Sequence, residues 1–289
     1  MIQRYMDLED RFRVRPGRRL KLADHDPADK AGLDKQASEK LRAKDLEKLD
    51  ALQERLYAEG KRSLLVVFQA MDAAGKDGTI EHVMSGVNPQ GVNVTSFKQP
   101  THAELAHDFL WRCQLALPAR GEIGIFNRSH YEEVIVVRVH PEYLAGQGLK
   151  ASRGLWKERY DAITAWERHL HASGTRVVKF FLHVSKAEQR ERFLARAEEA
   201  DKNWKFSEGD VVERAHWDDY QRAFEAALAA TSTEEAPWYV IPADRKWLMR
   251  TAVASILVHH LEEMDPRFPQ PSEDEQAAIG EAVEQLRAE

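Results

Sequence analysis

Five short runs rich in hydrophobic residues recur along this chain, separated by longer stretches, and the first of them, residues 64–68, is unbroken. Continuous apolar character over the length of a strand is typical of a parallel sheet that is buried on both faces. The intervening stretches are long enough for the crossover helices that parallel strands require. The runs occupy residues 64–68, 92–97, 123–126, 177–184 and 238–241. The pattern therefore predicts an α/β fold around a five-stranded parallel sheet.

A helical period precedes the first run. Leucines recur at helical spacing after Lys35, and the pattern stops at Gly60, a residue suited to end a helix. We therefore expect an amphipathic helix over residues 35–60. Residues 1–34 contain prolines and glycines without a sustained period, so we expect them to lie as an arm over the body.

Composition argues against several classes of protein. Hydrophobic residues make up 43% and charged residues 31% of the 289 positions, which is an ordinary globular balance. No apolar stretch reaches the roughly 18 residues of a membrane span, and residues 1–15 lack the features of a signal peptide, so we expect a cytoplasmic protein. Cys113 is the single cysteine and has no disulfide partner. The net charge of −6 argues against a nucleic-acid partner.

A candidate phosphate-binding loop follows the first apolar run. Residues 69–79 read QAMDAAGKDGT and stand between a predicted strand and a predicted helix, which is the context that such a loop requires. The N–H groups of the loop surround a phosphate, and the lysine reaches the transferring group. The residues expected to bind phosphate here are Ala73, Ala74, Gly75, Lys76, Asp77 and Gly78. The alternative is an ordinary glycine-containing turn.

Two positions of this loop depart from the usual motif. Ala70 replaces the first glycine, and Asp77 replaces the serine or threonine that ligates magnesium. The metal must then be held differently. Asp72 is the candidate ligand because Mg²⁺ prefers carboxylate oxygen.

Polar residues also follow the third run, where a strand of this kind usually supplies an aspartate to the metal. Asn127 takes that position, and its amide is a second candidate ligand. Arg128 offers a fixed fork of donors to phosphate. Glu133 is a candidate for orienting the acceptor or a second ion. The alternative for Glu132 and Glu133 is a solvated helix start, where acidic residues are favoured.

Basic residues cluster after the fourth run. Arg192 and Arg196 are four positions apart and share one face of a predicted helix, and Lys205 and Arg214 follow. Cations on a mobile helical lid neutralise a transferring phosphoryl group and exclude water. We therefore predict a lid over residues 186–230 in which these four residues bind phosphate. The alternative is a solvated basic surface.

Aromatic residues and histidines contribute less to the prediction. Trp217, Tyr220 and Phe224 have helical spacing and are expected in the core. The histidines lack the spacing of a zinc site. His130 is the histidine nearest the predicted chemistry, and a covalent phosphohistidine there is the alternative to direct in-line transfer.

With these residues laid out, the chain resembles polyphosphate kinase family 2. The matching motifs are MDAAGKD at 71–77, VNPQG at 87–91, FNRS at 126–129, WKFS at 204–207 and APW at 236–238. The resemblance runs from about residue 12 to about residue 260, and the combination is far more specific than the loop alone. It implies a P-loop kinase-like three-layer fold with a helical lid and an N-terminal helical extension. The implied division is an arm and helix at 1–60, a kinase domain at 61–265 and an acidic tail at 266–289.

The resemblance also implies a site and its ligands. Asp72, Lys76, Arg128 and either Arg192 or Arg196 match functional positions of the family. A basic channel for polyphosphate, Mg²⁺ or alternatively Mn²⁺, and a homo-oligomer are implied as well. The long N-terminal extension, with Asn127 and Glu133, is similar to the branch that phosphorylates both AMP and ADP.

We therefore expect reversible in-line transfer of a phosphoryl group from inorganic polyphosphate to AMP or ADP, with Asp72, Lys76, Arg128 and Glu133 as catalytic residues. One alternative is an ATP-dependent kinase of a nucleotide or small molecule, because the loop and lid do not identify the donor. A second alternative is a catalytically weak module that binds nucleotide or polyphosphate.

Overall fold

The sheet has the predicted composition. The computed structural model describes residues 2–199 and 203–289, and its five strands are ordered β2-β3-β1-β4-β5 with every neighbouring pair parallel. The strands are β1 (Ser63–Ala70), β2 (Val92–Ser96), β3 (Ile123–Asn127), β4 (Thr175–His183) and β5 (Trp238–Pro242). Each strand begins and ends within two residues of a predicted run. The predicted α/β fold with a five-stranded parallel sheet is confirmed.

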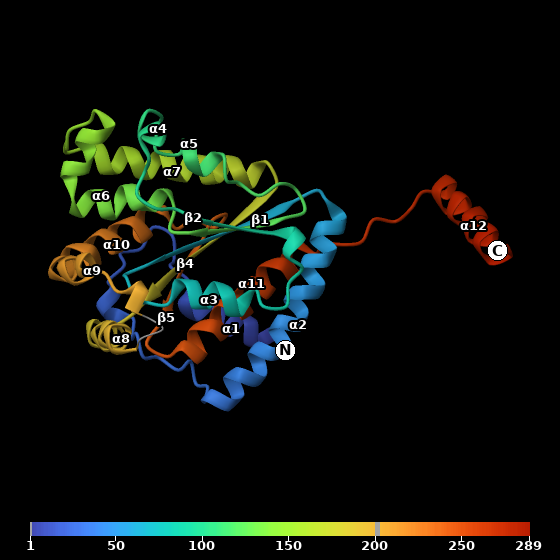
Figure 1. The fold of residues 1–289 in the computed structure, drawn as a ribbon, viewed down its shortest axis with the longest axis horizontal. Helices are drawn as coiled ribbons and strands as arrows, with labels where there is room; N and C mark the ends of the chain where they lie inside the picture. Colours follow the sequence, from blue (N-terminus) through green and yellow to red (C-terminus); the bar gives the residue numbers. More distant parts are fainter. Residues whose placement is uncertain (1, 200–202) are drawn as a thin grey trace.

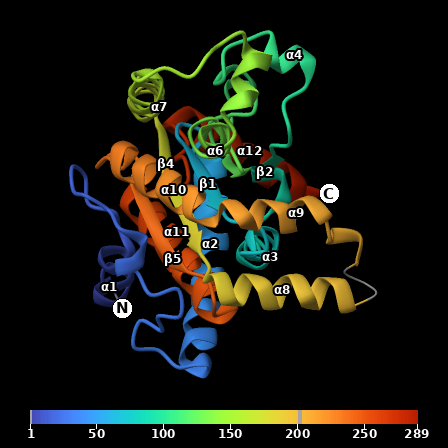
Figure 2. The same ribbon diagram turned by 90° about the vertical axis from the view of Figure 1, so that its left-hand side faces the viewer.

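Helices cover both faces of the sheet and give three layers (Figure 1). One face carries α1 (Ile2–Phe12), α2 (Lys35–Glu59), α3 (Lys76–Val83) and α11 (Lys246–Met264). The other carries α4 (His102–Leu105), α5 (Trp111–Gln114), α6 (Val136–Val139), α7 (Leu155–Ala172) and α10 (Trp217–Thr231). Figure 2 shows α8 (Lys186–Glu198) and α9 (Glu208–Glu213) near the start of α3. Both faces of the central strand are therefore buried, as its continuous apolar sequence requires.

The predicted helix before the first strand is α2. It begins after Asp34, whose side chain caps the N–H of Ala37, and ends at Gly60 in the left-handed conformation with φ +61°. Leu49 and Leu56 are fully buried on the face that packs against α11. The predicted bounds and amphipathic character are thus confirmed.

The N-terminal arm contains a helix that the sequence pattern did not reveal. Helix α1 packs against α11 and buries Leu8 and Phe12, which lie one turn apart. Beyond it, the N–H of Val14 donates to the carbonyl of Trp238 at 2.8 Å. These tertiary contacts stabilise a helix that is too short to be stable alone in water.

The predicted lid is divided between two parts of the fold. Trp217, Tyr220 and Phe224 are buried, as expected of core residues, and α10 packs on α6 and α7. Only α8 and α9 remain at the edge of the sheet, and residues 200–202 between them lie outside the described part of the chain. Helix α10 therefore belongs to the body of the domain.

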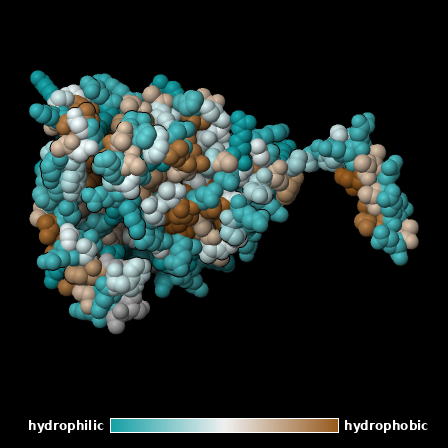
Figure 3. All heavy atoms as spheres, turned by 45° about the horizontal axis from the view of Figure 1, so that its top comes forward, coloured by the Kyte–Doolittle hydropathy of each residue, from teal (hydrophilic) through white to brown (hydrophobic). Residues whose placement is uncertain are grey.

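The acidic tail ends in α12 (Glu273–Ala288), which stands away from the body (Figure 1). Every residue of this helix is exposed, and its apolar residues Ile279, Val283 and Leu286 share one side. The space-filling view shows apolar side chains on this helix and scattered over the body among polar ones (Figure 3). Within the described residues, no helix has the length and apolar character to cross a bilayer.

A buried ionic network supports the turn that follows β3. Lys179 on β4 is fully buried and donates to Glu167 on α7, to the hydroxyl of Tyr131 at 3.0 Å and to the carbonyl of Thr231 at 2.8 Å. Tyr131 lies in the 3-10 turn η3 (His130–Val134) and also donates to Glu167 at 2.9 Å. The network thus connects the interior of the sheet with the polar segment after β3.

We predict that Lys179→Met lowers the free energy of unfolding by about 3–5 kcal/mol, because it leaves the carboxylate of Glu167 buried without its cation. The double variant Lys179→Met/Glu167→Leu should lose less than the single variant. Equilibrium unfolding in urea measures both. Lys157→Met is the control, since its ion pair with Asp161 is exposed and should change stability by less than about 1 kcal/mol. A double variant that loses more unfolding free energy than Lys179→Met alone would contradict the prediction.

Candidate active site

The loop after β1 has the backbone conformation of an anion cradle. Ala73 and Gly75 both adopt left-handed conformations, with φ +60° and +106°, and α3 begins at the next residue, Lys76. Glycine tolerates this conformation freely, whereas alanine is strained in it. Successive N–H groups in such a turn, followed by a helix N-terminus, form a concave site for phosphate.

Three of the predicted catalytic residues converge at this loop. The Nζ of Lys76 donates to the carbonyl of Ala70 at 3.2 Å, and Arg128 donates from Nη2 to Oδ1 of Asp72 at 3.1 Å. Arg128 has φ +63°, and its N–H donates to the carbonyl of Phe68 at 3.1 Å, so the end of β3 turns towards the loop. Burial lowers the pKa of Lys76, and the nearby carboxylate of Asp72 opposes that shift. The site is thus a compact group of interacting charges.

Compared with the usual motifs, the carboxylate and the neutral polar group have changed places between positions 77 and 127. The amide Nδ2 of Asn127 donates to Oδ1 of Asp77 at 2.6 Å. In the usual arrangement a loop serine or threonine and a strand aspartate hold the metal. Here the loop position supplies the carboxylate and the strand position supplies the neutral group. The two positions that depart from the usual motifs are therefore in direct contact.

The donor set fits a divalent metal that is shared with substrate phosphates. The described residues contain no group of three or more histidine, cysteine, aspartate or glutamate side chains that could hold an ion by itself. Mg²⁺ commonly binds through one or two carboxylates and completes its octahedron with water and phosphate oxygens. Asp72, Asp77 and the free carbonyl oxygen of Asn127 provide such ligands near the phosphate loop.

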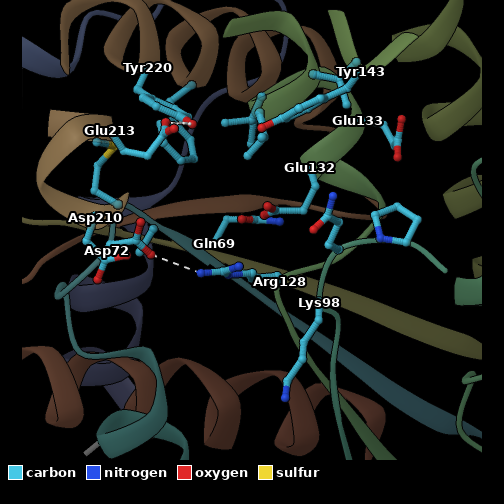
Figure 4. Close-up of a pocket in the computed structure, with 18 of the residues that line it drawn as sticks. Gln69, Asp72, Lys98, Arg128, Glu132, Glu133, Tyr143, Asp210, Glu213 and Tyr220 are labelled. Atoms are coloured by element: carbon cyan, nitrogen blue, oxygen red, sulfur yellow. Dashed lines mark hydrogen bonds and ion pairs between the residues drawn. The ribbon is translucent and has the colours of Figure 1, made fainter. Parts of the chain in front are cut away.

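Glu132 lies closer than Glu133 to the charges of Lys76 and Arg128. Burial raises the pKa of Glu132, while Arg128 and Lys76 oppose that shift, and Figure 4 shows its side chain between Gln69 and the centre of the pocket. Glu133 is buried, lines the same cavity and pairs with Arg159 at 3.0 Å. Its predicted role in orienting the acceptor or a second ion stays a prediction.

A cavity of about 520 Å³ opens beside the loop, a size that suits a small-molecule ligand. Asp72, Arg128 and Glu132 line one side of it, and Tyr143 and Tyr220 line the other (Figure 4). Charged groups thus face one part of a ligand while aromatic side chains face another. This division is suited to a molecule with both a phosphate and a ring.

Comparison with known proteins agrees with this geometry. The family model described as Polyphosphate kinase 2 matches residues 32–269. The chain belongs to the polyphosphate kinase 2 family. It is 53% identical over 229 residues to an ADP-polyphosphate phosphotransferase of Rhodopseudomonas palustris, covering 78% of this chain and 79% of the relative.

Other relatives cover more of the chain. An AMP/ADP-polyphosphate phosphotransferase of Meiothermus ruber is 49% identical over 263 residues, which are 90% of this chain and 96% of the relative. The crystal structure of polyphosphate kinase 2 from Arthrobacter aurescens TC1 superposes with a TM-score of 0.88 at 41% identity and covers 96% of both chains. The predicted family, P-loop kinase-like fold and enzyme class are thereby confirmed.

The lid residues of this polyphosphate kinase 2 chain differ in their surroundings. Arg214 lines the cavity and donates to Oε1 of Gln189 at 2.8 Å. Arg196 pairs with Asp210 at 3.7 Å. Arg192 donates to main-chain carbonyls and to Glu188, and its role as a phosphate donor stays a prediction. The side chain of Lys205 lies outside the described part of the structure.

Two acidic lid residues were missed by the sequence analysis. Asp210 and Glu213 on α9 line the cavity, and Glu213 accepts from the hydroxyl of Tyr220 at 2.7 Å and lies 2.9 Å from Nε2 of His140. Their spacing of three positions on one helix was the available signal. This acidic spacing did not indicate a site because basic residues are the expected ligands of a polyanion.

We predict that Glu132→Gln lowers kcat for polyphosphate-dependent phosphorylation of AMP and ADP by about tenfold or more, equivalent to about 1.4 kcal/mol of transition-state stabilisation. The reason is that its carboxylate faces Arg128 and Lys76. Glu133→Gln should chiefly lower the unfolding free energy, by about 3 kcal/mol, because it weakens a buried ion pair. Steady-state kinetics and denaturant unfolding separate the two effects. The reverse pattern, a lower kcat for Glu133→Gln and a lower stability for Glu132→Gln, would favour Glu133 as the catalytic residue.

Proposed function

We propose that this chain transfers phosphoryl groups from inorganic polyphosphate to AMP and to ADP, in a reversible in-line reaction supported by Mg²⁺. Polyphosphate-dependent phosphorylation of nucleotides follows from membership of the polyphosphate kinase 2 family. Use of both acceptors is supported by the relative from Meiothermus ruber, whose name includes AMP and ADP and whose length is almost fully matched. The observation that carries the site assignment is the convergence of Asp72, Lys76 and Arg128 beside one cavity.

The residues of the site have different roles in the proposed reaction. The loop N–H groups and Lys76 bind the phosphate that is transferred, while Arg128 neutralises the charge on the oxygens of the transition state. The acceptor lies in the cavity, with its phosphate towards Arg128 and its base towards Tyr143 and Tyr220. The chemistry then requires positioning and charge stabilisation rather than a covalent intermediate. His130 is fully buried, which disfavours phosphohistidine chemistry.

A kinase reaction of this type requires a divalent metal, and we assign Mg²⁺, with Mn²⁺ as a substitute. Asp72, Asp77 and the carbonyl oxygen of Asn127 would hold it. When bound, the ion neutralises charge on phosphate oxygens and fixes their orientation. Arg196 and Arg214 are proposed to contact the polymer or the acceptor from the lid. Homo-oligomerisation and a cytoplasmic location stay predictions.

The decisive assay combines the purified chain with Mg²⁺, long-chain polyphosphate and either AMP or ADP, followed by separation of the nucleotides over time. We expect ADP from AMP and ATP from ADP only when polyphosphate is present. Lys76→Ala tests the assignment of the site. It should lower turnover by about 10²–10³-fold, because it removes a cation that acts on the transition state. Transfer from ATP without polymer would favour the ATP-dependent kinase, and nucleotide binding without transfer would favour the binding module.

The exchanged pair at Asp77 and Asn127 gives a second prediction. Asp77→Ser should raise the Mg²⁺ concentration for half-maximal rate by about tenfold or more, since it removes a carboxylate from the metal site. Adding Asn127→Asp to this variant restores the usual arrangement and should recover much of the loss. Asn127→Asp alone is the control and should impair the enzyme by placing two carboxylates together. Failure of the double variant to recover would show that the pair does not hold the metal.

A further inference from the structure

The outer side of the phosphate loop is held by side chains from α8. The Nε2 of Gln189 donates to the carbonyl of Asp72 at 2.9 Å. One turn further along, the Nη1 of Arg192 donates to the carbonyls of Ala73 and Ala74 at 3.2 and 2.7 Å. Three consecutive carbonyls of the loop therefore receive hydrogen bonds from a single helix.

Arg192 is fully committed to these and similar contacts. Its Nη2 donates to the carbonyls of Ala243 and Asp244 at 2.6 and 3.3 Å, and its Nε donates to Glu188 at 2.8 Å. A guanidinium has five N–H donors, and the two loop carbonyls, the two carbonyls after β5 and Glu188 account for all of them. Its side chain is only 10% exposed. Arg192 thus ties the loop to the segment that follows β5.

Gln189 extends the same contact towards α9. It is 1% exposed, and its Oε1 accepts from Nη1 of Arg214 at 2.8 Å while its amide binds the loop. Arg214 also donates to the carbonyl of Lys186 at 2.8 Å. A neutral, buried glutamine in this place cannot serve to neutralise a phosphate. Its hydrogen bonds instead connect the loop with the lid.

The direction of the carbonyls determines the direction of the N–H groups. In a trans peptide the carbonyl and the following N–H point to opposite sides. Holding the carbonyls of Asp72 and Ala74 against α8 therefore turns the N–H groups of Ala73 and Gly75 away from that helix. The left-handed conformation of Ala73 is strained and persists only when its surroundings stabilise it. The contacts from α8 supply that stabilisation before any ligand binds.

We propose that Gln189 and Arg192 are positioning residues that hold the phosphate loop in its binding conformation. Helix α8 then supports the phosphate loop from one side. Arg192 acts through the loop rather than on phosphate. The inference deepens the proposed phosphoryl transfer, on which its catalytic consequence rests. The conformational claim itself concerns the free protein and is testable without substrate.

The test is hydrogen–deuterium exchange of the full chain without ligand, measured on peptides that cover residues 71–79. We expect Gln189→Met and Arg192→Met each to raise exchange in this segment by at least tenfold. Arg192→Lys should do the same, because an ammonium keeps the charge but cannot span the carbonyls of Ala74 and Ala243 together. Arg190→Met, at an exposed position of the same helix, is the matched control and should leave the loop unchanged.

Kinetics complete the test. Because the two residues act on one loop, we expect the kcat losses of Gln189→Met and Arg192→Met to be less than multiplicative in the double variant. Unchanged loop exchange in all three variants would overturn the proposal, whether or not activity falls. Exchange in α11 monitors global folding, and Arg192→Lys serves as the milder variant if Arg192→Met unfolds. If wild-type enzyme showed no transfer while loop exchange rose as expected, the proposed function would fail and the positioning claim would stand.

Discussion

The parallel pairing of β1 with β3 is the interaction on which the site depends. Its register places Phe68 beside Asn127, so β3 ends two residues before β1 does. The carbonyl of Phe68 then accepts the N–H of Arg128, and the phosphate loop follows the end of β1 at Ala70. Main-chain hydrogen bonds thereby bring together polar side chains from two segments that are more than fifty residues apart in the sequence. Ligand sites commonly occupy this end of parallel sheets for the same reason.

The site contains several acids although its substrates are polyanions. Asp72, Glu132, Asp210 and Glu213 all line the cavity. In the free protein Asp72 and Asp210 pair with Arg128 and Arg196, and Glu213 contacts a hydroxyl and an imidazole group, so the cations remain ordered without substrate. Carboxylates also provide ligands for a divalent ion, which can hold phosphate oxygens in turn. Acidic groups are therefore compatible with a phosphate site.

The sequence predicted the elements whose signal is local. β1, β3 and β5 are buried along almost their whole length and have largely apolar sequences, and α2 has a capped helical period. Lys76 and Arg128 were identified because each follows a strand in a recognisable order. The choice between Glu132 and Glu133 depended on how a 3-10 turn directs neighbouring side chains, which the sequence does not encode locally. The partners of Arg192 lie more than fifty and more than one hundred positions away, so spacing gave no indication of them.

The exchanged groups at Asp77 and Asn127 have a consequence for tracing ancestry. A search that scores each position separately counts two departures, one in each motif, although a hydrogen bond joins the two side chains. A lineage passing from one arrangement to the other must cross an intermediate with either two carboxylates or none. The two positions should therefore covary among descendants, and the pair is a better marker of shared descent than either residue alone.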